Sequence, residues 1–245
     1  MKILAHRGAS TSAPENTLAA IRLAAELKTD GVEIDVRLTR DGQLAVIHDT
    51  DTRRVAPGQP VHAVKRQSLA NLQKLDVGSW KDAKFANERI PAIKDVLAAL
   101  GPEQEIFIEL KSRESIEIMK VLDQSLSPPA KEGFPTARAV VMGFDESTVR
   151  AIKKKRKDWR VLLLLNHKPT THLYGQILSS IRAKFLDGIG QNRTWTLTDE
   201  QYADLREAGA ILSVWTVNNP AEAKAWQDRG FDYLTSDCPE KFIKS

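Results

Sequence analysis

A chain of 245 residues is long enough for one large domain, and its 42% of hydrophobic residues can supply a sizeable core. The 28% of charged residues and the formal net charge of +4 exclude a disordered polyelectrolyte, and the mild positive excess suits a phosphate-bearing small molecule. Cys238 is the single cysteine, which excludes an intrachain disulfide and fits a reducing compartment.

Neither a membrane nor a nucleic acid is indicated as a partner. No segment approaches the roughly 18 consecutive apolar residues of a membrane span, and Met1–Arg7 lacks the apolar stretch of a signal peptide. We therefore expect a cytoplasmic protein with no membrane span. Lys153–Lys157 form one dense basic run. No aromatic residues interleave it, so we expect a solvated helix end rather than a nucleic-acid contact.

Short apolar runs alternate with longer amphipathic stretches along the whole chain. The predicted strands are Ile3–Ala5, Val32–Val36, Ile106–Leu110, Ala139–Met142, Val161–Leu165, Phe185–Ile189, Ile211–Trp215 and Tyr233–Thr235. The predicted helices are Thr17–Leu27, Ile93–Leu100, Glu114–Leu122, Glu146–Lys155, Leu173–Arg182, Asp199–Ala208 and Ala221–Asp228, with Pro239–Ile243 as a closing turn. Such alternation predicts a parallel sheet, and eight units in one domain favour a closed TIM (β/α)₈ barrel over residues 1–245.

A ninth strand-like run, Leu44–Ile47, follows the second predicted strand too closely for a parallel crossover. The intervening Thr39–Gly42 is a turn sequence. We therefore expect Val32–Leu38 and Gln43–His48 to form an antiparallel hairpin. Its register places His48 roughly opposite Ile34, within reach of the carboxylates on either side of that residue.

The segment Asp49–Arg89 is too long for an ordinary loop, and Ser68–Leu72 is its one probable short helix. We interpret residues 49–89 as an insertion that packs over one end of the barrel and caps its catalytic face.

Three carboxylates are candidates for a metal site. Glu33 and Asp35 are separated by one residue on a predicted strand, so their side chains share a face. Inside an apolar strand they would repel each other and lose hydration, and a bound cation removes both problems. Glu109, also within an apolar run, is the third candidate ligand. Oxygen ligands suit Mg²⁺ or Ca²⁺ better than zinc. Salt bridges to nearby basic residues are the alternative.

Cations and histidines also end the predicted strands, where barrel enzymes place their active sites. Arg7 and Lys111 suit a phosphate group, a role compatible with pairing to the carboxylates. His6 and His48 each end a strand-like run near the carboxylates, and we predict that they are a general acid–base pair. Trp215, at the end of another strand, is a candidate wall for the substrate, with a core position as the alternative.

Other polar residues have structural interpretations at this stage. Asn16, within Pro14–Thr17, is expected to be a helix N-cap. We expect structural roles for His62, His167 and His172, although His167 follows a predicted strand and could contact the substrate.

The ordered motifs resemble those of the glycerophosphodiester phosphodiesterase family over nearly the whole chain. They are His6-Arg7-Gly8, Pro14-Glu15-Asn16-Thr17, Glu33-Ile34-Asp35-Val36, His48-Asp49, Asp76-Val77-Gly78-Ser79-Trp80, Glu109-Leu110-Lys111, Phe144-Asp145, Trp215-Thr216-Val217-Asn218 and Thr235-Ser236-Asp237-Cys238-Pro239. Gly143 and Ser236 depart from the family's commoner residues, which bears on substrate preference more than on activity.

The resemblance implies hydrolysis of a glycerophosphodiester, a small-molecule substrate, to glycerol 3-phosphate and an alcohol. It assigns acid–base roles, metal ligation and phosphate binding to the same residues as above: His6 and His48; Glu33, Asp35 and Glu109; Arg7 and Lys111. The alternatives are a lysophospholipase D-like or phospholipase C-like phosphodiesterase, or a phosphate-binding pseudoenzyme. Neither the leaving alcohol nor the oligomeric state is readable from the sequence.

Overall fold

The computed structural model describes residues 1–111, 115–126 and 134–243. The strands in these ranges are β1 (Lys2–His6), β2 (Gly31–Leu38), β3 (Leu44–Val46), β4 (Glu105–Leu110), β5 (Ala139–Gly143), β6 (Arg160–Leu165), β7 (Gly188–Asn192), β8 (Ile211–Trp215) and β9 (Tyr233–Ser236). They form one sheet in the order β1-β9-β8-β7-β6-β5-β4-β2-β3, which β1–β2 pairing closes. Among these described strands, only β3 is antiparallel to its neighbour, so the others form a parallel TIM barrel, as predicted.

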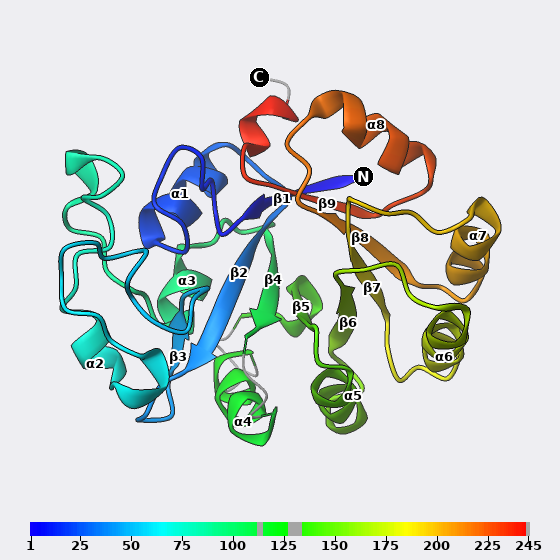
Figure 1. Ribbon diagram of the computed structural model, residues 1–245, viewed down its shortest axis with the longest axis horizontal. Helices are drawn as coiled ribbons and strands as arrows, with labels where there is room; N and C mark the ends of the chain where they lie inside the picture. The colour runs from blue at the N-terminus through cyan, green and yellow to red at the C-terminus, as the bar shows by residue number, and fades with distance from the viewer. Residues whose placement is uncertain (112–114, 127–133, 244–245) are drawn as a thin grey trace.

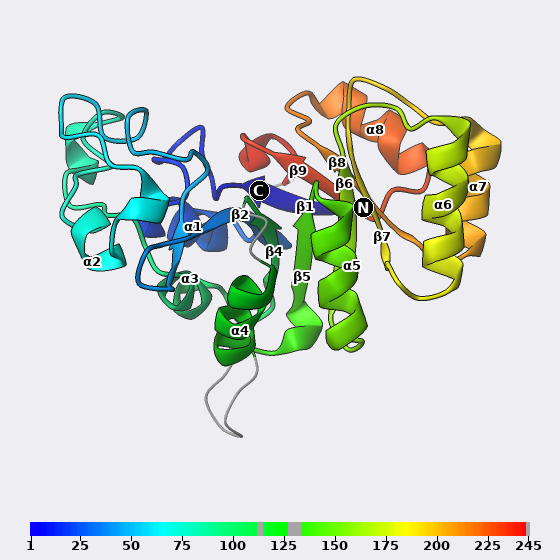
Figure 2. The same cartoon turned by 60° about the horizontal axis from the view of Figure 1, so that its bottom comes forward.

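Helices surround the strands on the outside of the barrel (Figures 1 and 2). The described α-helices are α1 (Leu18–Glu26), α2 (Leu69–Leu72), α3 (Ile93–Ala99), α4 (Ser115–Leu126), α5 (Glu146–Lys155), α6 (Thr171–Arg182), α7 (Asp199–Glu207) and α8 (Pro220–Asp228). Single 3₁₀ turns cover Val64–Arg66, Ala83–Phe85, Thr136–Arg138 and Pro239–Lys241. Glu114, the predicted start of the helix observed as α4, lies outside the described residues. None of the described helices has the length and apolar composition needed to cross a membrane.

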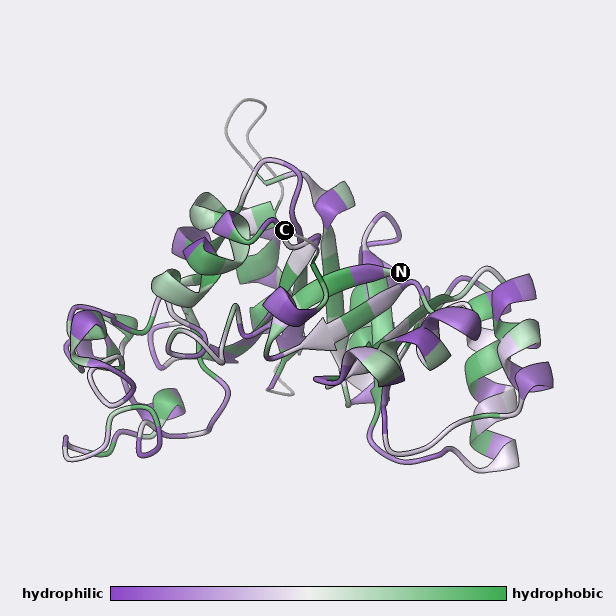
Figure 3. Ribbon diagram, turned by 90° about the horizontal axis from the view of Figure 1, so that it is seen from above, coloured by the Kyte–Doolittle hydropathy of each residue, from purple (hydrophilic) through white to green (hydrophobic). Residues whose placement is uncertain are grey.

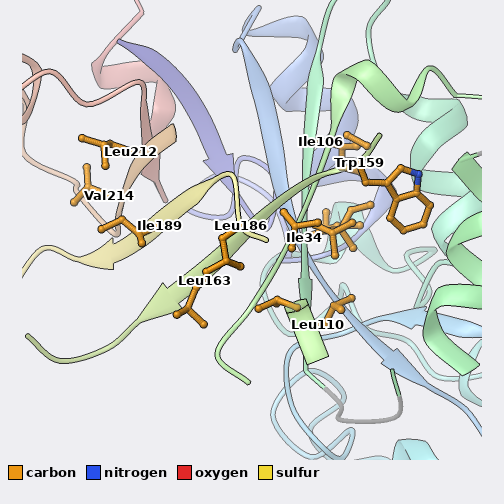
Figure 4. Close-up of a cluster of buried hydrophobic side chains, with 14 of the residues drawn as sticks. Ile34, Ile106, Leu110, Trp159, Leu163, Leu186, Ile189, Leu212 and Val214 are labelled. Carbon is orange, nitrogen blue, oxygen red and sulfur yellow. The ribbon is translucent and has the colours of Figure 1, made fainter. Parts of the chain in front are cut away.

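Alternation along each strand separates an outer core from an inner one. Leu163 on β6 packs in the outer cluster between strands and helices, whereas its neighbours Leu162 and Leu164 pack inside the barrel. Figure 4 shows part of the outer cluster, to which successive strands contribute. In Figure 3 hydrophobic residues run along the central strands, and the surrounding helices mix hydrophobic and hydrophilic residues. Burying each such aliphatic side chain contributes about 1.5–3 kcal/mol, so the two clusters supply most of the driving force for closure.

The same alternation positions the carboxylates. On β2 the apolar residues Val32, Ile34 and Val36 belong to the outer cluster. Glu33 and Asp35 therefore point into the barrel, and both are buried. On β4 the outward residues are likewise apolar, which leaves Glu109 facing inward.

At the end of the barrel where the parallel strands begin, polar side chains cluster around Glu105, the first residue of β4. Its carboxylate pairs with Lys2 at 2.7 Å and with Arg160 at 2.8 Å. The hydroxyl of Tyr233 donates to the same carboxylate, at 3.1 Å from Oε2, and the Tyr233 ring packs on Phe107 with centroids 4.7 Å apart. These residues stand at or near the N-terminal ends of their strands, away from the C-terminal ends of the strands.

The predicted hairpin is confirmed, because Val36 pairs with Val46 and the ladder runs antiparallel. Beyond it, residues 49–89 surround a separate apolar cluster that includes Val55, Leu72 and Val77 (cyan and teal in Figure 1). The short helix predicted in this segment is also present, as α2.

The sixth barrel strand is a correction. The prediction placed it at Phe185–Ile189, but β7 begins at Gly188 and the Phe185 side chain is half exposed. The strand ends in Gln191 and Asn192. Because these two residues are polar, the prediction from apolar runs did not assign them to a strand. Gly188 is required by packing, because a Cβ atom there would lie 2.0 Å from the carbonyl oxygen of Ile211.

Two local predictions are also wrong. Thr17, rather than Asn16, caps α1, since its side chain accepts from the backbone N–H of Ala20. The basic run is not wholly solvated, because Lys153 is buried and donates to the Trp159 carbonyl at 2.6 Å. Asp187 neutralises its charge at 2.7 Å.

Candidate active site

A cavity of about 300 Å³ opens at the C-terminal ends of the barrel strands. Its walls are His6, Arg7, Glu33, His48, Glu109, Lys111, Met142, Phe144, Leu164, Asn166, Ser213, Trp215, Thr216 and Thr235. Every predicted site residue is among them except Asp35, which is fully buried and lies beside Glu109 on the neighbouring strand. A more open groove of about 810 Å³ lies between α5 and α6, but it contains none of the predicted residues. The smaller cavity is therefore the candidate site.

Three carboxylates form its floor. Glu33, Asp35 and Glu109 offer oxygen atoms that all lie within 4.8 Å of one another. Burial, reinforced by the charge of Asp35, raises the pKa of Glu33 to about 8 and raises that of Glu109 as well. Within the described part of the chain, Oε1 of Glu33 is buried and has no hydrogen-bond partner. An unpartnered oxygen in a buried, all-oxygen cluster fits a hard divalent cation.

Asp35 keeps its charge because cations and an amide surround it. Burial would raise the pKa of Asp35, but Lys111 and Arg7 hold it below its usual value. Nζ of Lys111 lies 3.2 Å from Oδ1, and Nε of Arg7 lies 3.2 Å from Oδ2. The side-chain amide of Asn16 donates to Oδ2 at 2.9 Å, and its carbonyl accepts from the Asp35 backbone N–H at 3.3 Å. Asn16 thus fixes both ends of this aspartate.

The two predicted phosphate-binding cations stand beside the carboxylates. Lys111 also pairs with Glu109 at 2.5 Å, and the backbone N–H of Arg7 donates to Glu33 at 3.1 Å. Burial would lower the pKa of both basic side chains, but the charge of Asp35 raises them. Both remain charged and line the cavity, so both can meet an anionic substrate.

His6 is held by Asp237, which follows β9. The Nδ1 atom of His6 lies 2.6 Å from Oδ1 of Asp237, and Nε2 lies 3.8 Å from Glu33. Burial opposes protonation, but the hydrogen bond to Asp237 and the charge of Glu33 raise the pKa of His6. Burial would raise the pKa of Asp237, but His6, with further hydrogen bonds from Asn218 and Ser10, lowers it to about 2. An ionised Asp237 favours a protonated His6.

His48 has the opposite tendency. Its Nδ1 atom lies 2.6 Å from Oδ1 of Asp49. Burial lowers the pKa of His48, and the charges of Lys111 and Arg7 add to that effect, so the raising influence of Asp35 and Asp49 is outweighed. His48 therefore favours the neutral form.

Aromatic rings form one wall of the cavity. Phe144 and Trp215 meet edge to face with centroids 5.7 Å apart, and Nζ of Lys111 lies 6.0 Å from the Phe144 centroid. Phe144 is 43% exposed, which leaves much of its surface available to a ligand. At the position where His167 was considered, Asn166 lines the cavity. Its side-chain oxygen accepts from Asn192 at 3.1 Å.

The family model described as the glycerophosphoryl diester phosphodiesterase family matches residues 6–241. The chain belongs to this family. A glycerophosphodiester phosphodiesterase of Caldanaerobacter subterraneus is 29% identical over 242 residues, which cover 98% of this chain and 96% of the relative. The predicted membership, and with it the prediction of a phosphodiesterase, is confirmed.

Solved structures of glycerophosphodiester phosphodiesterases and related enzymes have the same fold as this chain. A phosphodiesterase of Oleispira antarctica, solved in complex with the product sn-glycerol-3-phosphate, superposes with a TM-score of 0.85 and 25% identity. The alignment covers 98% of this chain and 94% of that one. A glycerophosphodiester phosphodiesterase of Agrobacterium tumefaciens, 24% identical, has a TM-score of 0.79 with 99% of each chain covered, which supports the fold.

Several residues around the candidate active site were not predicted from the sequence. Asp49 had been noted only as a member of a motif, Asp237 as a motif member that follows the last predicted strand, and Glu15 and Arg54 had no assigned role. Asp49 directly follows a candidate catalytic histidine, which is a signal that could have been used. The partnership of Glu15 with Arg54 joins positions 39 residues apart, and no local pattern predicts it.

Proposed function

We propose that the protein hydrolyses glycerophosphodiesters to glycerol 3-phosphate and an alcohol, and that a divalent cation held by Glu33, Asp35 and Glu109 is required. The observation that carries this proposal is the buried carboxylate cluster at the floor of a cavity that also contains two histidines and two cations. The product bound to the Oleispira antarctica relative supports the same substrate class. A cation in this cluster would lower the pKa of a coordinated hydroxyl and offset phosphoryl charge.

The histidines divide the proton transfers in this scheme. Neutral His48 accepts the proton of the glycerol hydroxyl that attacks the neighbouring phosphorus. Protonated His6, supported by Asp237, gives its proton to the leaving alkoxide. The attack is intramolecular, so the nucleophile acts at a high effective concentration. Water then opens the resulting cyclic phosphate, with the two histidines exchanging roles.

The remaining residues bind and orient. Arg7 and Lys111 offset the charge that develops on the phosphoryl oxygens, because both line the cavity and both stay protonated. Trp215 and Phe144 offer an apolar wall to the carbon atoms of the substrate.

A coupled assay for glycerol 3-phosphate, run across a panel of glycerophosphodiesters with and without added Mg²⁺ or Ca²⁺, tests the proposal. We expect turnover that chelation abolishes and the cation restores. Turnover that persists after exhaustive chelation, in protein free of metal by elemental analysis, would remove the cation from the scheme. A substrate analogue without the vicinal hydroxyl tests the cyclic phosphate, since rapid hydrolysis of that analogue indicates direct attack by water.

Three further properties of the protein remain predictions. One is a cytoplasmic location, and another is the use of Mg²⁺ or Ca²⁺ in particular. The third concerns the single catalytic domain over residues 1–245, in which residues 49–89 act as a cap. The described lining of the cavity comes from the barrel and from His48 at the end of the hairpin. Trimming residues 49–89 in a variant that still folds, and comparing the substrate ranking, tests the capping role.

A further inference from the structure

We propose that Arg54, which lies outside the cavity, is a positioning residue that holds His48 and Arg7 in place through two carboxylates, Asp49 and Glu15. The inference rests on the proposed function, because the placement of His48 and Arg7 affects turnover only if these residues act in it. Arg54 belongs to the segment 49–89, so the inference also gives this segment a specific part in the chemistry of the barrel.

The guanidinium of Arg54 binds both carboxylates at once. Its Nε donates to Oδ2 of Asp49 at 2.7 Å. Its two terminal nitrogens donate to the two oxygens of Glu15, at 2.5 Å and 2.8 Å. Only a planar group with several fixed donors can make this set of bonds, and a lysine ammonium is a single point charge.

One side of this arrangement leads to His48. The oxygen of Asp49 that does not face Arg54, Oδ1, lies 2.6 Å from Nδ1 of His48. Arg54 therefore fixes the plane of a carboxylate that in turn fixes the imidazole. Asp49 occupies Nδ1, which leaves Nε2 as the nitrogen that can accept a proton in the cavity.

The other side leads to Arg7. Oε1 of Glu15 accepts from Arg54 and also from Nη1 of Arg7, the latter at 2.9 Å. Nε of Arg7 faces Asp35 at 3.2 Å on its other edge. Without Arg54, the charge of Glu15 would act on Arg7 alone and draw its guanidinium away from Asp35 and from a substrate phosphate. The side chains of Glu15 and Arg7 are only 14% and 18% exposed, so solvent screens this pull weakly.

The neighbouring Arg53 shows how an ordinary surface arginine differs. Its side chain is 76% exposed, and its Nη2 atom lies 4.0 Å from Oδ2 of Asp51. Such exposed pairs contribute little. The Arg54 bonds are bidentate, and they join residues before α1 and after β3 that are far apart in sequence. Arg53 is therefore a matched control one position away.

The kinetic test compares Arg54→Ala with Arg53→Ala on the diester panel. We expect Arg54→Ala to lower kcat by about 10–100-fold, the range for residues that orient the side chains which contact the substrate or metal. We also expect it to raise KM several-fold. Arg53→Ala should stay within about two-fold of wild type. Asp49→Asn should lower mainly kcat, and Glu15→Gln should raise mainly KM. The double variant Arg54→Ala/Asp49→Asn should lose less than the product of the two single losses, because both act through His48.

Three readouts separate positioning from a general loss of structure. Millimolar guanidinium should restore part of the activity of Arg54→Ala and leave Arg53→Ala unchanged. Calorimetric binding of glycerol 3-phosphate should weaken in Arg54→Ala even if no diester is turned over, so failure of the proposed function and failure of this inference can be distinguished. If Arg54→Ala does not fold, Arg54→Lys decides, since it should fold and still lose kcat. Kinetics and binding of Arg54→Ala or Arg54→Lys that match Arg53→Ala would overturn the inference.

Discussion

Glu33 and Asp35 stand two residues apart on β2 and face the same barrel interior, yet their carboxyl groups have opposite affinities for a proton. The pKa of Glu33 is raised to about 8 by burial and by the charge of Asp35. The pKa of Asp35 is lowered, because Lys111 and Arg7 outweigh its burial. The metal-free cluster therefore holds one firmly ionised carboxylate, Asp35, and two carboxyl groups that are reluctant to ionise, Glu33 and Glu109.

This difference predicts pH-dependent cation binding. Below about pH 8 a cation must displace the proton of Glu33, so affinity for Mg²⁺ or Ca²⁺ should rise as the pH increases toward 8, and binding should release a proton. Titration calorimetry in two buffers of different ionisation enthalpy measures both quantities. A cation affinity that is constant from about pH 6 to about pH 9, with no proton release, would contradict the assignment of Glu33 as a ligand.

A second prediction concerns the stability of the metal-free protein. A carboxyl group whose pKa is raised on folding costs nothing below its unfolded pKa near 4.5, and its cost grows as the pH rises toward the folded value of about 8. Glu33→Gln removes this cost. At pH 8 in chelator we expect Glu33→Gln to melt about 4 °C or more above wild type, since 1 kcal/mol corresponds to about 2–4 °C in a domain of this size.

Two measurements complete this test. Well below pH 4.5 the melting temperatures of Glu33→Gln and wild type should converge, because Glu33 is then protonated in the unfolded state as well as in the folded state. The more stable variant should nevertheless lose cation-dependent turnover. A lower melting temperature for Glu33→Gln at pH 8 would show that the carboxylate stabilises the fold rather than serving a ligand.

The sequence predicted the carboxylate cluster and the hairpin because both follow from local spacing. Alternation on a strand put Glu33 and Asp35 on one face, and a short turn fixed the register that brings His48 close. The role of Asn16 was not predictable in this way. A cap before a helix is a local pattern, whereas the two hydrogen bonds between Asn16 and Asp35 depend on how β1, α1 and β2 pack together.

The errors have similar physical origins. Lys153 was expected in solvent because a lysine run is usually solvated, but its partners Trp159 and Asp187 come from the next turn and from the loop before β7. The predicted bounds of β7 lay too close to the N-terminus because Gln191 is polar and was not assigned to a strand. Gln191 is nevertheless fully buried, since its side chain accepts from Tyr202 at 2.9 Å and donates to the Trp195 carbonyl at 2.8 Å. Long-range pairing of polar groups was beyond the reach of periodicity in both cases.

The acid and base assignments predict distinct pH profiles. His6→Ala and His48→Ala should each lower kcat by about 10²–10⁴-fold, the range for removal of a general acid or base. The wild-type profile of kcat/KM should be bell-shaped. His48→Ala should lose the acidic limb, because the proton acceptor is gone, and His6→Ala the alkaline limb. Loss of the alkaline limb in His48→Ala would reverse the assignment.

Asp237→Asn gives a finer test of the same scheme. The carboxylate of Asp237 raises the pKa of His6 through the 2.6 Å hydrogen bond. Without that charge, His6 should release its proton at lower pH, so the alkaline limb should move to lower pH while the acidic limb stays in place. Unchanged limbs, measured on the same diester, would show that Asp237 has no electrostatic role.

The base of the barrel offers a prediction for stability without activity. Glu105 is buried, pairs with Lys2 and Arg160 and accepts from Tyr233, all at the end opposite the cavity. The variant Glu105→Ala leaves a half-exposed Lys2 and a partly buried Arg160 without their carboxylate, so it should lower the free energy of unfolding by about 1–3 kcal/mol, less than the loss of a fully buried ion pair. The kcat and KM of the folded variant should match wild type.

Burial would raise the pKa of Glu105, but the bonds from Lys2 and Arg160 lower it. Its contribution is therefore present above pH 4.5, near the ordinary pKa, and disappears as the pH falls through the folded value. Denaturant unfolding at neutral and at acidic pH should show the gap between wild type and Glu105→Ala narrowing in acid. A gap that stays constant would mean that Glu105 stabilises the barrel through packing rather than through its charge.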